Sequence, residues 1–188
     1  MPDEEFLLLG EALWLEFVNT AESPPVGRDS LSDPGEYLRW TKAVRIEPPR
    51  DASAFDDALT LRTRLLALAR ALDTGRNPPP SAIEAINRLL VGMEGREQLV
   101  RVGGNWQLRI QPVRPPTALE AVAQSAAQTL ANPIAVIRRC ANPGCGLYFS
   151  DESPNQSRRW CSRSRCGDTG RIERRRITPR PTPMITEG

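Results

Sequence analysis

The sequence predicts an α+β fold in which a mostly helical N-terminal domain with a small antiparallel sheet precedes a short cysteine-rich unit. Three observations support this prediction. Apolar residues recur at helical spacing in the N-terminal part, two alternating runs flank a Gly-Gly-Asn triplet, and all four cysteines lie within residues 140–166. We expect a boundary at Pro133, which gives a domain of residues 1–133, a second unit of residues 134–177 and an extended or disordered tail of residues 178–188.

The first elements are expected to be a strand and two helices. The run FLLL at residues 6–9 indicates an opening strand, and EALWLEFVNT at residues 11–20 indicates a helix. Residues 21–35 are rich in Pro, Ser and Gly and predict a loop. A short helix over residues 36–46 follows, with Tyr37 and Trp40 expected to pack inward.

The clearest helix is expected over residues 54–73, where leucines recur at i, i+4, i+7 and i+11 and form one apolar stripe. The segment NPPP at residues 77–80 then interrupts the helical pattern. A further helix is predicted to begin at Ser81, with Glu84 three residues later completing a capping box.

A β-hairpin is predicted at residues 98–110, because the runs QLVRV and WQLRI alternate apolar and polar residues around the Gly-Gly-Asn triplet. The segment TALE at residues 117–120 is a second capping box, and it opens an Ala-rich helix expected to end near Leu130. The N-terminal domain is therefore long enough to bury a core of its own.

Composition excludes much of the usual enzyme chemistry. The chain has no histidine, so no Ser-His or Cys-His nucleophile and no histidine metal ligand is available. Its 25 basic residues include one lysine, Lys42, which has no glycine-rich surroundings. Single carboxylates such as Asp56 and Asp57 do not form a convincing catalytic set. We therefore expect that the protein is not an enzyme.

The net charge of +2 is unevenly distributed. Residues 1–134 hold 14 basic and 18 acidic residues, whereas residues 135–188 hold 11 arginines and 5 acidic residues. A basic C-terminal unit on a mildly acidic body suggests an anionic partner. No apolar run is long enough to span a bilayer, and the acidic N-terminus does not resemble a secretory signal, so a cytoplasmic location without a membrane partner is expected.

The cysteines form two short-spaced pairs, Cys140-x4-Cys145 and Cys161-x4-Cys166. Two disulfides, a redox or nucleophilic site, and a metal could each explain such a cluster. A reducing cytoplasm disfavours disulfides, the chain lacks the C-x-x-C motif beside a βαβ unit, and no histidine could activate a thiol. Two cysteine pairs separated by 15 residues match the pattern of a structural four-thiolate zinc site, with one Zn²⁺ ion.

The flanking residues indicate a treble-clef arrangement. The strand-like run IAVIRR at residues 134–139 and the run LYFS at residues 147–150 predict a hairpin whose tip carries the first cysteine pair. The second pair falls where a helix over residues 162–177 is expected to begin. A helix N-terminus suits anionic thiolates, and metal binding would supply the folding free energy of so short a unit.

The segment CANPGCGLYFSDESPNQSRRWCSRSRCGD resembles the CGNR-type zinc finger, with the four cysteines on its zinc-ligand positions. LWLEFVNT at residues 13–20 is similar to the Leu-x-Leu-Asp-Phe-x-Asn-Thr opening of the ABATE domain, which commonly precedes this finger. Members of this family are regarded as bacterial, stress-induced transcription regulators. The resemblance therefore implies a DNA-binding finger and an N-terminal domain that senses a small ligand.

The chain departs from the family pattern at three positions. The Cys-Gly-Asn-Arg signature reads Cys166-Gly167-Asp168-Thr169, so the Asn and Arg that could contact a base or a phosphate are replaced. Glu16 stands where the N-terminal pattern usually has Asp.

Arginines of the basic unit are the candidates for contacting nucleic acid. If residues 162–177 are helical, three of these arginines share one face and could follow a phosphate backbone. The candidate DNA-contacting residues are Arg158, Arg159, Arg163, Arg171, Arg174 and Arg175. The first alternative is a protein-interaction module whose arginines dock on an acidic partner or on the chain's own N-terminal domain. The second, which the missing histidine and the single lysine disfavour, is an enzyme that uses a pocket of the N-terminal domain.

A small-ligand site in the N-terminal domain is the remaining expectation. Trp14, Trp40 and Trp106 could line an apolar pocket, with Glu16 and Asn19 supplying polar contacts. The candidate ligand-binding residues are therefore Trp14, Glu16 and Asn19. The other interpretation is that the tryptophans fill the core and that Asn19 ties down the end of the first helix.

Overall fold

A computed structural model describes residues 6–9, 11–22, 28–49 and 54–167 of the 188-residue chain. It has the predicted α+β fold, with five α-helices and two two-stranded antiparallel sheets in the described ranges. In chain order the elements are α1 (Leu13–Asn19), η1 (Thr20–Glu22), α2 (Pro34–Ala43), α3 (Ala54–Asp73), α4 (Pro80–Val91), β1 (Gly95–Val102), β2 (Asn105–Pro112), α5 (Ala118–Ala131), β3 (Val136–Arg139), β4 (Tyr148–Asp151) and the helical turn η2 (Arg163–Gly167).

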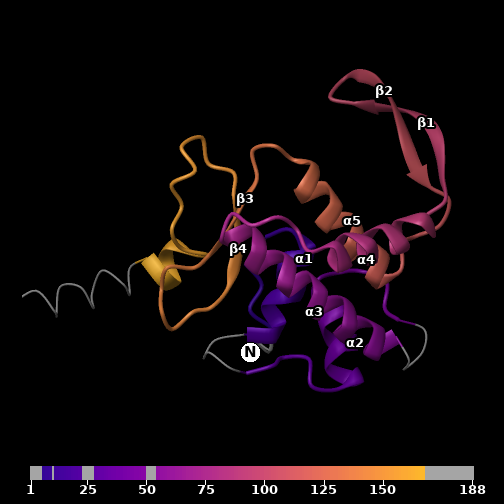
Figure 1. Cartoon of the computed structure of the whole chain (residues 1–188). Coiled ribbons are helices and arrows are strands. Elements are labelled where there is room, and N and C mark those ends of the chain that lie inside the picture. Colours follow the sequence, from indigo (N-terminus) through magenta and orange to yellow (C-terminus); the bar gives the residue numbers. More distant parts are fainter. Residues whose placement is uncertain (1–5, 10, 23–27, 50–53, 168–188) are drawn as a thin grey trace, which may run out of the picture.

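Helix α1 lies at the centre of the helical domain, between α3 and α5 (Figure 1). Its sequence LWLEFVN is apolar on nearly every side, as expected of a helix that packs against neighbours all round. Every residue from Trp14 to Asn19 is buried. Tyr37 and Trp40 of α2 pack against Phe17 in the same core, so the predicted inward face of this helix is confirmed.

Two local expectations were wrong. Residues 6–9 contain no strand; this segment crosses from the helical core, where Phe6 packs, to the cysteine cluster, where Leu7 and Leu9 pack. Helix α4 begins at Pro80 rather than at Ser81, and its N-cap residue Pro79 provides no side-chain cap. Proline suits the first helical position because the N–H that it lacks has no partner there. Since the helix starts at Pro80, Ser81 lies inside its first turn and not at the N-cap position that a capping box requires.

The capping box at the start of α5 is confirmed. Thr117 accepts a hydrogen bond from the Glu120 backbone N–H, and the Glu120 carboxylate accepts one from the Thr117 N–H. The guanidinium of Arg114 also donates two bonds of 2.7 Å to this carboxylate. The segment that follows β2 is thereby fixed to the first turn of α5.

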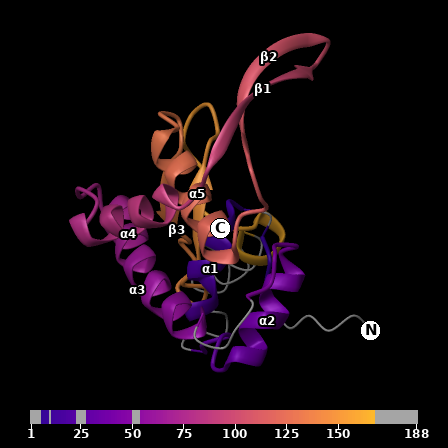
Figure 2. The same cartoon turned by 90° about the vertical axis from the view of Figure 1, so that its right-hand side faces the viewer.

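The predicted hairpin is confirmed as β1 and β2, which pair antiparallel from Gly95–Pro112 at the base to Val102–Asn105 at the tip. Gly103 and Gly104 both adopt positive φ in the turn, a conformation that suits glycine. The ribbon projects beyond the helices in both views (Figures 1 and 2).

Strands β3 and β4 form the second antiparallel pair, from Val136–Asp151 to Arg139–Tyr148. This hairpin packs on α3 and α1 and does not stand apart from the helices (Figure 1). Ile137 and Tyr148 are buried in the same core cluster as Trp14. The cysteine unit and the helical domain therefore share one hydrophobic core.

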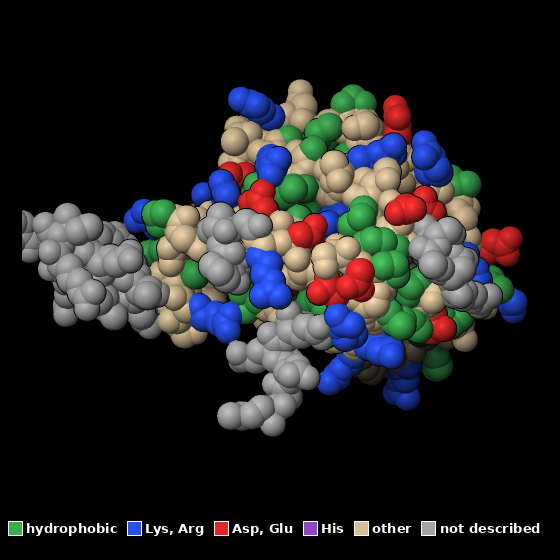
Figure 3. All heavy atoms as spheres, turned by 90° about the horizontal axis from the view of Figure 1, so that it is seen from below, with side chains coloured by type: hydrophobic (Ala, Val, Ile, Leu, Met, Phe, Trp, Pro, Cys, Tyr) green, Lys and Arg blue, Asp and Glu red, His purple; other side chains and the backbone are tan. Residues whose placement is uncertain are grey.

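Positive and negative side chains are interspersed on the face seen from below (Figure 3).

In the described ranges, no helix combines the length and apolar character needed to cross a bilayer.

Candidate metal centre

The four cysteines come from two places on the same small unit. Cys140 directly follows β3, and Cys145 lies in the turn before β4, where the Cys140 N–H donates to Leu147 O at 2.8 Å. Gly146 supplies the left-handed residue of this turn, with φ of 75°. Cys161 lies just before the turn η2 and Cys166 lies within it, on a separate segment of the chain. The hydrogen bond from the Ala141 N–H to Arg159 O ties this segment to the first pair.

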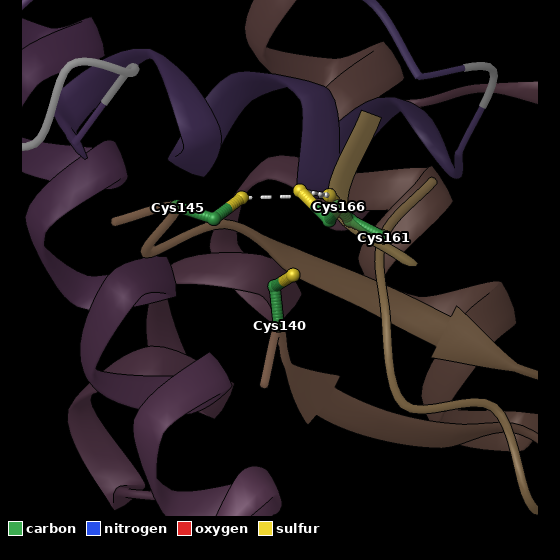
Figure 4. A group of neighbouring side chains, drawn as sticks. All are labelled: Cys140, Cys145, Cys161 and Cys166. Carbon is green, nitrogen blue, oxygen red and sulfur yellow. Dashed lines mark hydrogen bonds between the residues drawn. The ribbon is translucent and has the colours of Figure 1, made fainter. Parts of the chain in front are cut away.

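All four side chains are buried and point toward one another (Figure 4). Their Sγ atoms lie within 4.8 Å of one another, with 3.5 Å between Cys145 and Cys161 and 3.7 Å between Cys161 and Cys166. A tetrahedral ion with Zn–S bonds of about 2.3 Å separates its sulfurs by about 3.8 Å. A disulfide would need about 2.05 Å, so the cluster fits a metal and not a covalent pair.

The crowded thiols oppose each other's ionisation. Hydrogen bonds from Cys145 and Cys161 lower the pKa of the Cys140 thiol, and the pKa of Cys145 rises to about 12 because Cys140 takes the negative charge. The pKa of Cys161 is also raised, through Cys140 and Cys145. The protein by itself therefore favours no more than one thiolate among these three, whereas a divalent cation at the centre reverses this preference.

A small apolar cluster surrounds the sulfurs. Phe149 and Leu147 of the hairpin are fully buried beside the cysteines, and Leu7 and Leu9 from the N-terminal segment cover the same cluster. This burial shields the thiolates from water. The residues before α1 thus complete the cysteine unit.

Arg158 is among the predicted DNA-contacting residues, but its guanidinium is used inside the protein. It donates to Glu11 at 2.6 Å, to Ser150 O at 3.2 Å and to the carbonyl of the ligand candidate Cys161 at 2.5 Å. It also lies over the Phe149 ring, 4.5 Å from its centroid. Arg158 therefore joins the N-terminal segment, β4 and the second cysteine pair.

Asn19 connects the helical domain to the cysteine unit. Its side-chain Nδ2 donates to Tyr148 O at 2.9 Å, and its Oδ1 accepts from the Tyr148 N–H at 2.8 Å. The pair is buried and the residues are 129 positions apart. Asn19, expected either at a ligand site or as a tie at the end of the helix, holds β4 against α1.

Glu16 and Trp14 also have partners within the protein. The Glu16 carboxylate accepts from the backbone N–H groups of Leu9 and Glu11, at 2.9 and 2.8 Å, and so fixes the segment before α1. The Trp14 indole donates to Thr129 of α5 at 3.0 Å. Trp106 lies at the tip of the exposed β1–β2 hairpin, so the three tryptophans proposed for one pocket are not brought together.

Further acidic residues of the helical domain hold the cysteine unit, a role that no sequence pattern indicates. The Glu11 carboxylate accepts from the Ser150 N–H at 2.9 Å, and Asp73 at the end of α3 accepts from the Arg139 N–H at 2.7 Å. Glu22 binds Arg139 at 3.3 Å. Each is an isolated carboxylate in the sequence, and no spacing pattern connects it with its partner.

Arg159 and Arg163 remain exposed beside the cysteine cluster. Arg159 lies over the ring of Trp160, 5.6 Å from its centroid, and in the described part of the chain neither arginine forms an ion pair with a carboxylate. The other candidates, Arg171, Arg174 and Arg175, lie outside the described residues, as do Asp168, Thr169 and most of the helix expected over residues 162–177.

A cavity of about 320 Å³ lies elsewhere in the helical domain, between the start of α5 and the segment after α2. Its walls include Tyr37, Pro48, Pro49, Pro115 and Leu119. The Tyr37 hydroxyl is buried without a hydrogen-bond partner among the described residues, and burial raises its pKa.

Two family models match the chain. The ABATE model, described as a "putative stress-induced transcription regulator", matches residues 11–133, and the model of the CGNR zinc finger matches residues 137–177. No curated protein matches the chain. The first match covers more than half of the sequence, and the second contains all four clustered cysteines.

Proposed function

The chain belongs to the ABATE family and contains a CGNR zinc finger, and from this we propose that it is a transcription regulator whose finger contacts DNA. The finger carries one structural zinc ion. We assign its ligands as Cys140, Cys145, Cys161 and Cys166, which close the coordination shell and leave no open position for catalysis. The zinc ion is thus a structural component that holds two strands of chain together.

The observation that carries the DNA proposal is the exposure of Arg159 and Arg163 beside the zinc cluster. Guanidinium groups that have no carboxylate partner in the described ranges can bind phosphate oxygens, and such contacts position a protein on DNA without specifying a sequence. Arg171, Arg174 and Arg175 extend the same basic segment and belong to the proposed surface by sequence alone. Arg158 does not belong to it, because its donors serve the protein itself.

The test is fluorescence anisotropy with a random-sequence duplex of DNA, measured from about 50 to about 200 mM salt. We expect the affinity of the zinc-loaded protein to fall steeply with salt. Replacing Arg159 and Arg163 with alanine should reduce the slope of log K against log salt by about 0.9 for each phosphate that the variant no longer neutralises. The triple replacement of Arg171, Arg174 and Arg175 with alanine should reduce it further.

The matched control replaces Arg76 and Arg88 with alanine, which removes two exposed arginines from the helical domain. This variant should bind as the wild type does. Equal reductions in both double variants would mean that only the overall charge matters, and absence of binding at low salt would overturn the proposal. Arg158→Ala should lower thermal stability and zinc retention and leave the salt slope unchanged.

The second candidate function is a protein-interaction module, and a specific observation favours it. Arginines of the finger already dock on carboxylates of the helical domain, as Arg158 does on Glu11 and Arg139 does on Glu22. An acidic partner protein could be bound by Arg159 and Arg163 in the same way. Failure to bind DNA, together with an intact zinc site, would favour this candidate.

We also propose that the helical domain binds a small, largely apolar ligand in the cavity beside Tyr37. Its volume of about 320 Å³ lies at the lower end of the range of ligand pockets, about 300–1,000 Å³. Its walls are mainly apolar and include Pro48, Pro49, Pro115 and Leu119. The probe 1-anilinonaphthalene-8-sulfonate should be more strongly fluorescent with the wild type than with Leu119→Trp, whose larger side chain fills the cavity. Equal fluorescence in both would exclude this cavity.

A further inference from the structure

The hairpin β1–β2 has one apolar face that no other part of the described structure covers. Cross-strand partners share a face, and so do residues two apart along a strand. By the strand register, one face of the ribbon therefore carries Glu97, Leu99, Arg101, Trp106, Leu108 and Ile110. We refer to these six residues as the hairpin face.

The four apolar side chains of the hairpin face are largely open to solvent. Leu99 is 58% exposed, Leu108 63%, Trp106 65% and Ile110 74%. The opposite face is mainly polar, and there Arg109 donates two hydrogen bonds to the Gln107 side chain. An isolated two-stranded hairpin is only marginally stable in water, and a contiguous exposed apolar face generally marks an interaction surface.

The charges on the hairpin face are placed at its two ends. Glu97 lies toward the base of the ribbon and pairs in register with Ile110, whereas Arg101 lies toward the tip and pairs with Trp106. Leu99 and Leu108 face each other midway between them. The face is therefore acidic at one end, basic at the other end and apolar along its length.

We propose that the hairpin face binds the hairpin face of a second copy of this chain, with the two ribbons antiparallel. A two-fold axis at Leu99 and Leu108 places the tip of one ribbon over the base of the other. Arg101 then meets the partner's Glu97 twice by symmetry, and Trp106 packs on the partner's Ile110. A parallel arrangement would bring Arg101 toward Arg101 and Glu97 toward Glu97, so the charges select the closed, antiparallel dimer.

The position of the hairpin leaves the zinc finger accessible in such a dimer. The hairpin and the loops of the finger lie at opposite ends of the molecule (Figure 1). The proposed dimer requires neither zinc nor DNA. Evidence for or against it is therefore independent of the proposed function. Six residues on each copy are fewer than the roughly 20–30 of a standard interface, so a concentration-dependent equilibrium is expected.

The test is sedimentation velocity of the full chain from about 1 to about 100 μM, the range in which weak homodimers are populated. The wild type should shift from monomer to dimer. Glu97→Arg alone and Arg101→Glu alone each create two like-charge contacts and should weaken dimerisation at least about tenfold. The double variant carrying both changes should regain the wild-type dimer, and an equimolar mixture of the two single variants should form a heterodimer.

Circular dichroism of each variant controls for folding, and all substituted side chains are exposed. A chain that remains monomeric throughout the range would overturn the proposal. A dimer that is insensitive to the charge variants and to Trp106→Ser would also overturn it, because the interface would lie on another face. If these variants instead reduced the DNA affinity of a monomer, the proposal would fall and the hairpin face would be a nucleic-acid contact.

Discussion

Asn19 satisfies both backbone groups of Tyr148 with one amide side chain, in the buried contact between α1 and β4. An amide is suited to this role because it offers a donor and an acceptor side by side. The LWLEFVNT motif of the helical domain thus contributes directly to the attachment of the zinc finger.

Asn19→Ala should lower the free energy of unfolding by about 1–3 kcal/mol, because it leaves a buried N–H and a buried carbonyl without partners. Urea unfolding followed by circular dichroism measures this change. Asn19→Asp is a second, isosteric variant. It keeps the acceptor, loses the donor and places a carboxylate oxygen against Tyr148 O. We expect it to be destabilised as well, and a neutral effect of both substitutions would contradict the role assigned to Asn19.

Glu120 links Arg114 to the start of α5. Its titration should change the free energy of unfolding as the pH is lowered. The hydrogen bonds from Arg114, with that from the Thr117 N–H, lower the pKa of this carboxyl from its ordinary value of 4.5 to about 2. A carboxyl whose pKa is lowered in the folded state stabilises the protein above its unfolded pKa and loses this effect as the pH falls through the folded pKa.

Glu120→Gln should therefore be less stable than the wild type by about 1–2 kcal/mol at neutral pH, after allowance for the half-exposed Arg114. The difference should shrink as the pH falls from about 4.5 toward about 2. Urea unfolding of both proteins across this range tests the prediction, and protonation of the zinc thiolates affects both proteins alike. A difference that does not change with pH would exclude ionised Glu120 as its source.

At the scale of elements, helix starts are predictable when the side chain itself forms the cap. Thr117 begins α5 as its sequence motif indicates, whereas at the similar motif of Ser81 the helix begins one residue earlier, at Pro80. Proline fixes φ near the helical value and starts the helix one residue earlier. The two motifs look equivalent in sequence, and each directly follows two prolines, so only the structure distinguishes them.

Thr117→Ala should therefore lower the free energy of unfolding by about 1 kcal/mol. Ser81→Ala, the same kind of change at an exposed helix position, should remain within about 0.5 kcal/mol of the wild type. Thermal melts of the two variants, measured in parallel with the wild type, compare their stabilities. Equal destabilisation would show that Ser81 caps α4 after all.

The zinc finger is the element whose chemistry is most predictable from the sequence. Cysteine spacing fixes which thiols can meet around one ion, because short loops limit their reach. The same sequence suggests that Arg158 faces solvent. Its partner Glu11 lies 147 residues away, so no local pattern could indicate the pair.

At the scale of the whole molecule, the helical domain and the finger are held together by a common core. Ile137 and Tyr148 of the finger are buried with the helices, while Leu7 and Leu9 from the N-terminal segment cover the zinc cluster. The finger thus contributes to the core of the helical domain, and the N-terminal segment contributes to the cluster around the cysteines. Loss of the metal should therefore affect helices that are remote from it.

Removal of zinc by a chelator should lower the melting temperature of the helical signal at 222 nm by on the order of 10 °C, because unfolding of the finger exposes Ile137 and Tyr148. Cys140→Ser should behave similarly without chelator. Addition of zinc should restore the wild type and not the variant. An unchanged melting temperature would show that the helical domain folds independently of the finger.

The sequence by itself determined the helices with strong apolar periodicity, the β1–β2 hairpin and the four-thiolate cluster, because each depends on neighbours within about 30 residues. The tertiary structure decided which polar groups are available. Asn19, Glu16 and Arg158 are used internally, and Arg159 and Arg163 are left exposed. The alternating sequence of the hairpin also could not show that its apolar face is exposed. A strand pattern shows that the two faces differ, but it does not show which face another part of the protein covers.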